Sequence, residues 1–372
     1  MTEPRKAGSL IIARPVEPSP ANNYYDYEIL LLIRNKSMTF ANTVAYPGGK
    51  IEPKDAEFLT RNAQKLGLDP KTAGKSLHNL FKLSSIRETF EETGLFFAKE
   101  KLQDQSKLKE LQKSHQATKS LPDFYSLAEE LGIPFENELV EFMRFVTPFI
   151  FKHRFDAQFF VYKLDPSTAL NIHAGLSNTE ELYNLNNLNI NLGESSGYAW
   201  LNPAQTISKH IAQEFELAPP QIMITNILLS FKKFDDLLNH LKGFRKGVQK
   251  DQNGEFPKSY PLTFPISPMF SKAIEEGFKN RGFDSMIIFP YDSKYPTKMV
   301  LEKEKSQAWR EEFESHNSAI SIPPGSKCRH YYKQNYGVGA LEEVDISLEL
   351  DTPIKLLKST DTFKALFNKP SL

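Results

Sequence analysis

Three glutamates lie close together in residues 87–95, which read Arg-Glu-Thr-Phe-Glu-Glu-Thr-Gly-Leu. On an α-helix Glu88, Glu91 and Glu92 are three and four residues apart, so their carboxylates share one face. Like charges at this spacing repel one another, and a hard divalent cation with oxygen ligands removes that repulsion. The pattern predicts a site for Mg²⁺ or Mn²⁺, and an ordinary solvated acidic helix face is the alternative reading.

Residues elsewhere in the chain favour the metal site. Pro47-Gly48-Gly49 brings backbone close to a ligand where side chains would not fit. Asp55 follows Gly49 by six residues, and Arg87 precedes the first glutamate, where its guanidinium can pair with a carboxylate through two hydrogen bonds.

Together, Gly49, Asp55 and residues 87–95 resemble the signature box of the Nudix hydrolases, which cleave nucleoside diphosphates linked to another moiety. The second half matches at each fixed charged or glycine position, with Thr89 in place of the usual apolar residue. The first half departs from the family, because Asp55 stands where a glutamate is usual and 31 residues, 56–86, replace a short spacer.

This long spacer resembles one subgroup of the family, the peroxisomal coenzyme A diphosphatases. The resemblance covers roughly residues 8–235 and includes the run 43–55, the aromatic stretch 154–160 and Pro219-Pro220-Gln221. It implies coenzyme A or an acyl-coenzyme A as the substrate, with nucleotide sugars, ADP-ribose or dinucleotides as the alternatives.

The resemblance also implies roles for individual residues. Glu91 and Glu92 would be metal ligands, and Glu88 a ligand or the residue that orients the attacking water. The Gly49 backbone would approach the metal, and Arg87 would hold the carboxylates, so Arg87, Glu88 and Glu91 form the expected catalytic group. Glu194, in a loop ahead of a late strand, would be a further ligand, and an ordinary loop glutamate is an equal alternative.

Other residues have functional and structural readings. His153 and Arg154 could bind a phosphate, but an ion pair between Arg154 and Asp156 explains the same residues. Phe159 and Phe160 could stack on a base, although one of two neighbours on a strand faces the core in any case.

The elements that must position these residues alternate between strands and helices, which predicts an α/β fold: a Nudix-type α/β/α sandwich with a mixed sheet, helical insertions and a C-terminal extension. Hydrophobic patterning predicts strands at 8–13, 27–34, 44–46, 95–97, 145–151, 154–164 and 198–201, and helices from 83 to 93, 203 to 210 and 219 to 231. The Nudix domain is expected to span residues 1–235, with surface insertions at 56–86 and 99–145, and residues 236–372 form the extension.

Composition limits the remaining possibilities. The 46 basic and 46 acidic residues cancel, so no overall field attracts nucleic acid or an anionic membrane. One cysteine excludes an internal disulfide, and no apolar run is long enough to span a membrane. We expect a cytoplasmic protein, because the C-terminal Pro370-Ser371-Leu372 lacks the basic residue of a peroxisomal address.

The sequence therefore predicts a metal-dependent diphosphatase that acts on a small nucleoside diphosphate derivative, without nucleic-acid or membrane partners. A non-catalytic Nudix-fold binding module is the second hypothesis. The oligomeric state and the role of residues 240–372 are left open.

Overall fold

The structure, a computed structural model, describes residues 3–35, 43–101, 121–135, 138–149, 151–172 and 179–245, and short pieces beyond. Its helices are α1 (Pro53–Asn62), α2 (Leu77–Thr93), α4 (Phe124–Leu131), α5 (Thr179–Leu182), α6 (Pro203–Ile211), α7 (Pro219–Leu229), α8 (Phe234–Arg245) and the 3₁₀ turn η1 (Pro20–Asn22). The strands are β1 (Arg5–Pro15), β2 (Tyr27–Arg34), β3 (Thr43–Ala45), β4 (Gly48–Lys50), β5 (Leu95–Phe97), β6 (Val140–Val146), β7 (Phe155–Lys163), β8 (Ala169–Asn171), β9 (Ser195–Leu201), β10 (Glu216–Leu217), β11 (Pro265–Ile266), β12 (Met269–Ser271), β13 (Ser285–Ile288), β14 (Lys327–Tyr332) and β15 (Leu341–Ser347).

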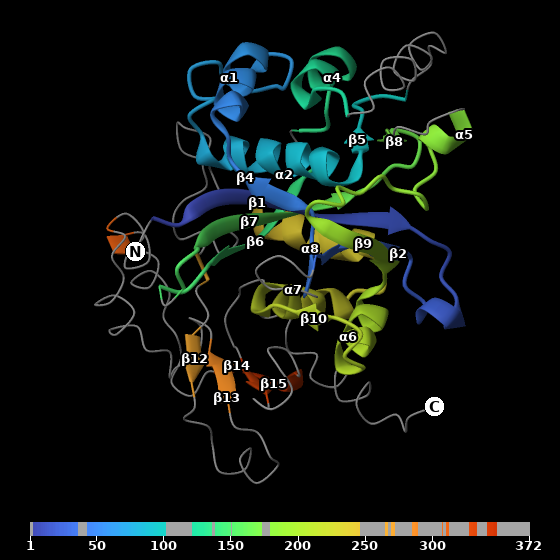
Figure 1. Ribbon diagram of the computed structural model, residues 1–372, viewed down its shortest axis with the longest axis vertical. Helices are drawn as coiled ribbons and strands as arrows, with labels where there is room; N and C mark the ends of the chain where they lie inside the picture. The colour runs from blue at the N-terminus through green and yellow to red at the C-terminus, as the bar shows by residue number, and fades with distance from the viewer. Residues whose placement is uncertain are drawn as a thin grey trace.

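A mixed sheet forms the centre of the fold. Its strands run in the order β10-β3-β2-β1-β7-β6-β11, with β4 paired to β1 and β9 paired to β2. Strands β1 and β7 are parallel, whereas β1–β2 and β6–β7 are antiparallel. Helices α1, α2 and α4 cover one face of the sheet, and α6 and α7 lie on the other (Figure 1). The predicted α/β/α sandwich with a mixed sheet is confirmed.

Alternation along the central strands explains how the sheet holds helix α2. Leu10 and Ile12 of β1 and Phe160 of β7 belong to one hydrophobic core with Ile86 and Phe90 of α2. Side chains at every second strand position point to the same face, so this apolar row lies under the helix. The glutamates of α2 are thereby fixed relative to the strand edge that carries Gly48 and Gly49.

The segment 56–86 is not the surface insertion that the sequence suggested. Residues 77–86 form the first half of α2, and α1 carries Phe58 and Leu59 into the same core as α2. Ala73, in the turns between the two helices, is fully buried there as well. Residues 56–86 therefore contribute to the core, and the length of the segment alone does not predict this.

The prediction of a surface insertion at 99–145 is also wrong for its second half. Helix α4 contributes Phe124 and Leu127 to the core, and all seven residues of β6 are buried in the sheet. The expected strand at 145–151 accordingly begins earlier, at Val140. Residues 102–120 of this segment lie outside the described residues.

The expected boundary at residue 235 falls inside helix α8. Phe234, Leu237 and Leu241 are buried, and α8 contacts β6. Farther along, β11 pairs with β6 in the main sheet, and β12 to β15 form an antiparallel sheet of four strands. The division into a Nudix domain and an extension stays a prediction, with α8 on the Nudix side.

None of the helices in the described part of the chain is both long enough and apolar enough to cross a membrane.

Candidate active site

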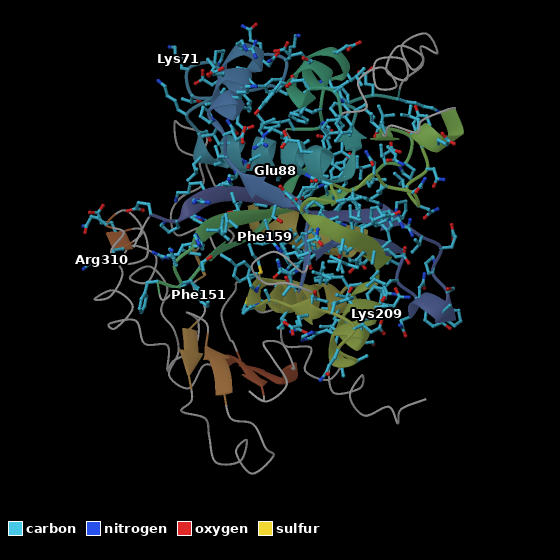
Figure 2. All side chains as sticks on the ribbon, in the orientation of Figure 1. Lys71, Glu88, Phe151, Phe159, Lys209 and Arg310 are labelled. Carbon is cyan, nitrogen blue, oxygen red and sulfur yellow. The ribbon has the colours of Figure 1, made fainter. Side chains whose placement is uncertain are left out.

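Helix α2 presents the predicted glutamates. Ser76 caps its start by accepting a hydrogen bond from the backbone N–H of Asn79. At its end Gly94 adopts a left-handed conformation (φ 70°), which glycine reaches without steric cost, and its N–H donates to the carbonyl of Phe90. Figure 2 shows Glu88 on α2, on the face of the sheet opposite Lys209 of α6.

Arg87 is the buried centre of the site, with 1% of its side chain exposed. Its Nε and Nη2 donate to the two carboxylate oxygens of Asp55 at 3.0 and 3.3 Å. Nη2 also donates to the carbonyl of Lys50 at 2.7 Å, and Nη1 donates to Glu88 at 3.1 Å and to Glu91 at 2.8 Å. The predicted role of Arg87 as the residue that holds the carboxylates agrees with this geometry.

Asp55 completes this arrangement from helix α1. Its carboxylate is fully buried and also accepts hydrogen bonds from the backbone N–H of Glu52 at 2.7 Å and from the hydroxyl of Tyr125 at 3.0 Å. The two halves of the sequence motif therefore meet in space, although residues 56–86 separate them along the chain.

Gly49 lies directly against the carboxylate of Glu88. A Cβ atom at position 49 would come within 2.3–2.5 Å of the Glu88 carboxylate, so any other residue would displace it. Burial raises the pKa of Glu88, Arg87 lowers it, and the nearby Glu91 and Glu194 raise it again. The structure thus brings Gly49, Glu88 and Glu194 together, as the sequence predicted.

Glu92 is held by the neighbouring glycine, because the backbone N–H of Gly48 donates to its carboxylate at 2.9 Å. Burial raises the pKa of Glu92 to about 8; the Gly48 hydrogen bond lowers it, and Glu88 and Glu194 contribute to the rise. Glu88, Glu92 and Glu194 therefore form a group of interacting carboxylates, which we call the acidic group.

Glu91 is bound by Arg87. Its side chain is 47% exposed and accepts a hydrogen bond from Arg87, and within the described residues it accepts none from the N–H groups of Gly48 or Gly49. Burial raises its pKa, Arg87 lowers it, and the further acids that raise it are Glu52 and Asp55. Glu91 thus belongs to the Arg87 network, and its charge acts on the acidic group through Glu88.

The chemistry of the acidic group fits a hard divalent cation. Three carboxylates whose charges disfavour one another, beside a glycine backbone, are the oxygen-rich surroundings that Mg²⁺ and Mn²⁺ prefer. Within the residues that the structure describes, however, no group of three or more acidic, histidine or cysteine side chains is arranged around a single point that a metal would occupy. The predicted ligand set is assembled only in part.

Arg34, at the end of β2, is a basic residue that the sequence interpretation did not select. Its charge lowers the pKa of Glu92, so its guanidinium lies near the acidic group. Its Nε is buried and makes no hydrogen bond within the described part of the chain. Tyr125 of α4 was missed as well, because nothing in its local sequence connects it with Asp55.

Two charged residues that the sequence singled out, Arg154 and Asp156, make contacts within the chain. Asp156 pairs with Arg144 and with Lys6, so the expected pair between Arg154 and Asp156 is wrong. Arg154 instead donates to the carbonyl of Thr147 at 2.9 Å.

The aromatic pair is part of the packing. Phe160 is fully buried, and Phe159 packs edge-on against Tyr46 and Phe145. Neither ring is available to stack on a base.

Comparison with known proteins supports the same family. No family model matches the chain. Over 219 residues it is 23% identical to nudix hydrolase 7 of Caenorhabditis elegans, covering 56% of this chain and 57% of that protein. Over 262 residues it is 26% identical to an acyl-coenzyme A diphosphatase of Xenopus laevis, covering 59% of this chain and 64% of the relative. The chain thus spans less than two thirds of the length of either relative.

A crystal structure of a Nudix hydrolase from Alicyclobacillus acidocaldarius is 20% identical with a TM-score of 0.45, covering 64% of this chain and 97% of the other. The predicted resemblance is confirmed by the two sequence relatives: over more than half of its length the chain is similar to Nudix hydrolases, among them an acyl-coenzyme A diphosphatase.

Proposed function

We propose that this chain hydrolyses the diphosphate bond of a nucleoside diphosphate linked to another moiety. The observation that carries the proposal is the acidic group of Glu88, Glu92 and Glu194. Glu88 lies against Gly49, Glu92 accepts a hydrogen bond from the Gly48 N–H, and the pKa values of Glu88 and Glu92 are raised. A chain gains nothing in stability from repelling carboxylates in a partly buried place, so their arrangement favours a ligand that compensates their charge.

In this proposal the residues of the site have different roles. Arg87 fixes Glu88 and Glu91 through hydrogen bonds, and the Gly48 N–H fixes Glu92. When bound by the acidic group, Mg²⁺ or Mn²⁺ would neutralise the diphosphate and lower the pKa of a coordinated water. Glu88 is the proposed proton acceptor, because it lies between Arg87 and Gly49 at the centre of the two networks.

Coenzyme A or an acyl-coenzyme A is the proposed substrate. The support is the similarity to the Xenopus laevis acyl-coenzyme A diphosphatase, which covers 59% of this chain. Nucleotide sugars, ADP-ribose and dinucleotides contain the same diphosphate and are the competing substrates.

The test is a panel of these diphosphates, incubated with the purified chain and Mg²⁺ or Mn²⁺, with products separated by chromatography. Hydrolysis of coenzyme A adds water across the diphosphate and yields an adenosine bisphosphate and a phosphopantetheine. The variant Glu92→Gln, prepared in parallel, controls for contaminating phosphatases. Binding of a panel member without turnover would favour the non-catalytic module instead.

A further inference from the structure

Asp55 and Arg87 use all of their hydrogen-bonding capacity on each other and on five neighbours. An ionised carboxylate offers about four acceptor sites and a guanidinium five N–H donors. Asp55 accepts from Arg87 twice, from the Glu52 N–H and from Tyr125. Arg87 in turn has donors on Asp55, Lys50, Glu88 and Glu91. A planar guanidinium with every N–H hydrogen-bonded is held in one orientation, and this fixes the positions of the carboxylates of Glu88 and Glu91.

Among the residues that the structure describes, Tyr125 makes the one hydrogen bond to Asp55 that comes from outside helices α1 and α2 and the chain next to them. Its hydroxyl donates to Oδ1 at 3.0 Å across 70 residues of sequence. That is the oxygen which also accepts from Arg87 Nε, so the tyrosine and the arginine contact the same atom.

The ring of Tyr125 is itself held in place. It packs against Phe58 of α1, with ring centroids 5.6 Å apart, and against Phe124, at 5.5 Å. Helix α4 begins at a cap in which Asp123 accepts from the N–H of Ser126, so the tyrosine lies on a defined first turn. Burial and the adjacent Asp55 raise the pKa of Tyr125, which keeps its hydroxyl protonated as a donor.

We propose that Tyr125 is a positioning residue of the active site: its hydroxyl orients Asp55, and through Asp55 and Arg87 it holds Glu88 and Glu91 in their working arrangement. This inference rests on the proposed function. Asp55 is one methylene shorter than the glutamate usual at its position, and the tyrosine hydroxyl donates to the same carboxylate oxygen that accepts from Arg87 Nε. Helix α4 thereby becomes part of the catalytic apparatus without touching the substrate.

Tyr125→Phe tests this, because it removes the hydroxyl and keeps the ring against Phe58. Tyr27→Phe is the matched control: Tyr27 is buried, and its hydroxyl bonds the carbonyls of Leu228 and Phe231, away from α2. For each variant we would measure kcat and KM for coenzyme A and ADP-ribose, Mn²⁺ affinity by titration calorimetry, and the melting temperature.

Loss of a hydrogen bond to a charged group predicts that Tyr125→Phe lowers kcat about 10-fold and weakens Mn²⁺ binding about 3-fold, with KM within about twofold. Tyr27→Phe should change the melting temperature but neither kcat nor the Mn²⁺ affinity. Wild-type values for Tyr125→Phe, or equal losses in both variants, would overturn the proposal.

The two proposals fail in distinguishable ways. If the wild-type chain binds Mn²⁺ but cleaves no diphosphate, the proposed function is wrong, and the Mn²⁺ affinities of the two variants still decide the role of Tyr125. If the wild-type chain binds no Mn²⁺ and cleaves nothing, there is no metal site to position and both proposals are overturned.

Discussion

Two acidic sites in this molecule have opposite electrostatic surroundings. Asp156 of β7 is fully buried, and Arg144 donates to both of its oxygens at 2.7 Å while Lys6 adds a second cation. Burial would raise its pKa, but these cations outweigh burial and lower it to about 2. Glu92 of α2 is also largely enclosed, yet its surroundings raise its pKa to about 8.

The difference separates a structural acid from the acid that we propose to be functional. Asp156 has its countercharges within the chain, so its ionised form is part of the folded structure. The Gly48 N–H and Arg34 lower the pKa of Glu92, but the charges of the acids Glu88 and Glu194 raise it. A carboxylate whose negative charge is not fully balanced by groups of the chain favours binding of a positively charged ligand.

The largest expected effect is on stability, at the structural acid. Asp156→Asn leaves Arg144 buried without its anionic partner, which should lower the free energy of unfolding by about 3–5 kcal/mol. Urea unfolding followed by circular dichroism measures this. Asp235→Asn breaks an exposed ion pair with Lys163 and serves as the control, with little expected change. The folded fraction of Asp156→Asn should keep its kcat, and a lost kcat would place this pair in the active site.

The functional acid should show the reverse. Glu92→Gln keeps the shape of the side chain but removes a charge from the acidic group, so kcat should fall about 100-fold. Stability without metal should hold or rise, because repulsion with Glu88 and Glu194 is relieved. Steady-state kinetics and thermal melts measure the two quantities, with the exposed Glu214→Gln as control. Near-wild-type turnover would show that Glu92 is not part of the chemistry.

The pH dependence of stability should differ in sign between the two acids. The pKa of Glu92 is higher in the folded chain than in the unfolded chain. Its contribution to the free energy of unfolding is therefore fully present below about pH 4.5 and is lost as pH rises through about 8. The pKa of Asp156 is lower in the folded chain, so its contribution is present above about pH 4 and is lost as pH falls toward 2.

Chemical unfolding of the metal-free chain across this range measures both slopes. Glu92→Gln should flatten only the slope between about pH 4.5 and 8, and added Mn²⁺ should reduce the same slope in the wild type. A Glu92→Gln curve that parallels the wild type throughout would contradict the raised pKa.

The sequence predicted the parts of the site that depend on local spacing. Glu88 and Glu92 are four residues apart on one helix, and the unbroken run 87–95 matches the family pattern at each fixed charged or glycine position. The start of α2 was missed because the helix is covered on more than one side, with Asn79, Ser84 and Ser85 buried as well as its apolar residues. No single apolar stripe therefore marks its first half.

Contacts between distant segments could not be predicted in this way. Tyr125 reaches Asp55 across 70 residues, and Asp156 takes its partners from β1 and β6, two other strands of the sheet. For the same reason, residues 56–86 looked like a surface excursion in the sequence, although they contribute to the core. Deleting residues 60–78 would remove the buried Ala73 and the helix cap Ser76, so the deletion should unfold the chain.

The smallest expected effect concerns Arg34, whose charge lowers the pKa of Glu92 and which makes no ion pair within the described residues. Its buried Nε lacks an acceptor, and a phosphate oxygen of the substrate would supply one. Because Arg34 is half-exposed, Arg34→Gln should raise KM only about fivefold, with kcat changing less.

Arg34→Lys keeps the charge but not the Nε donor, so its KM should lie between those of the wild type and Arg34→Gln. The exposed Arg61→Gln controls for a general loss of positive charge, and kinetics at saturating Mn²⁺ separates substrate binding from metal binding. If KM is unchanged in Arg34→Gln, the unpaired nitrogen does not face the substrate, and the contrast between Glu92 and Asp156 would then rest on the carboxylates alone.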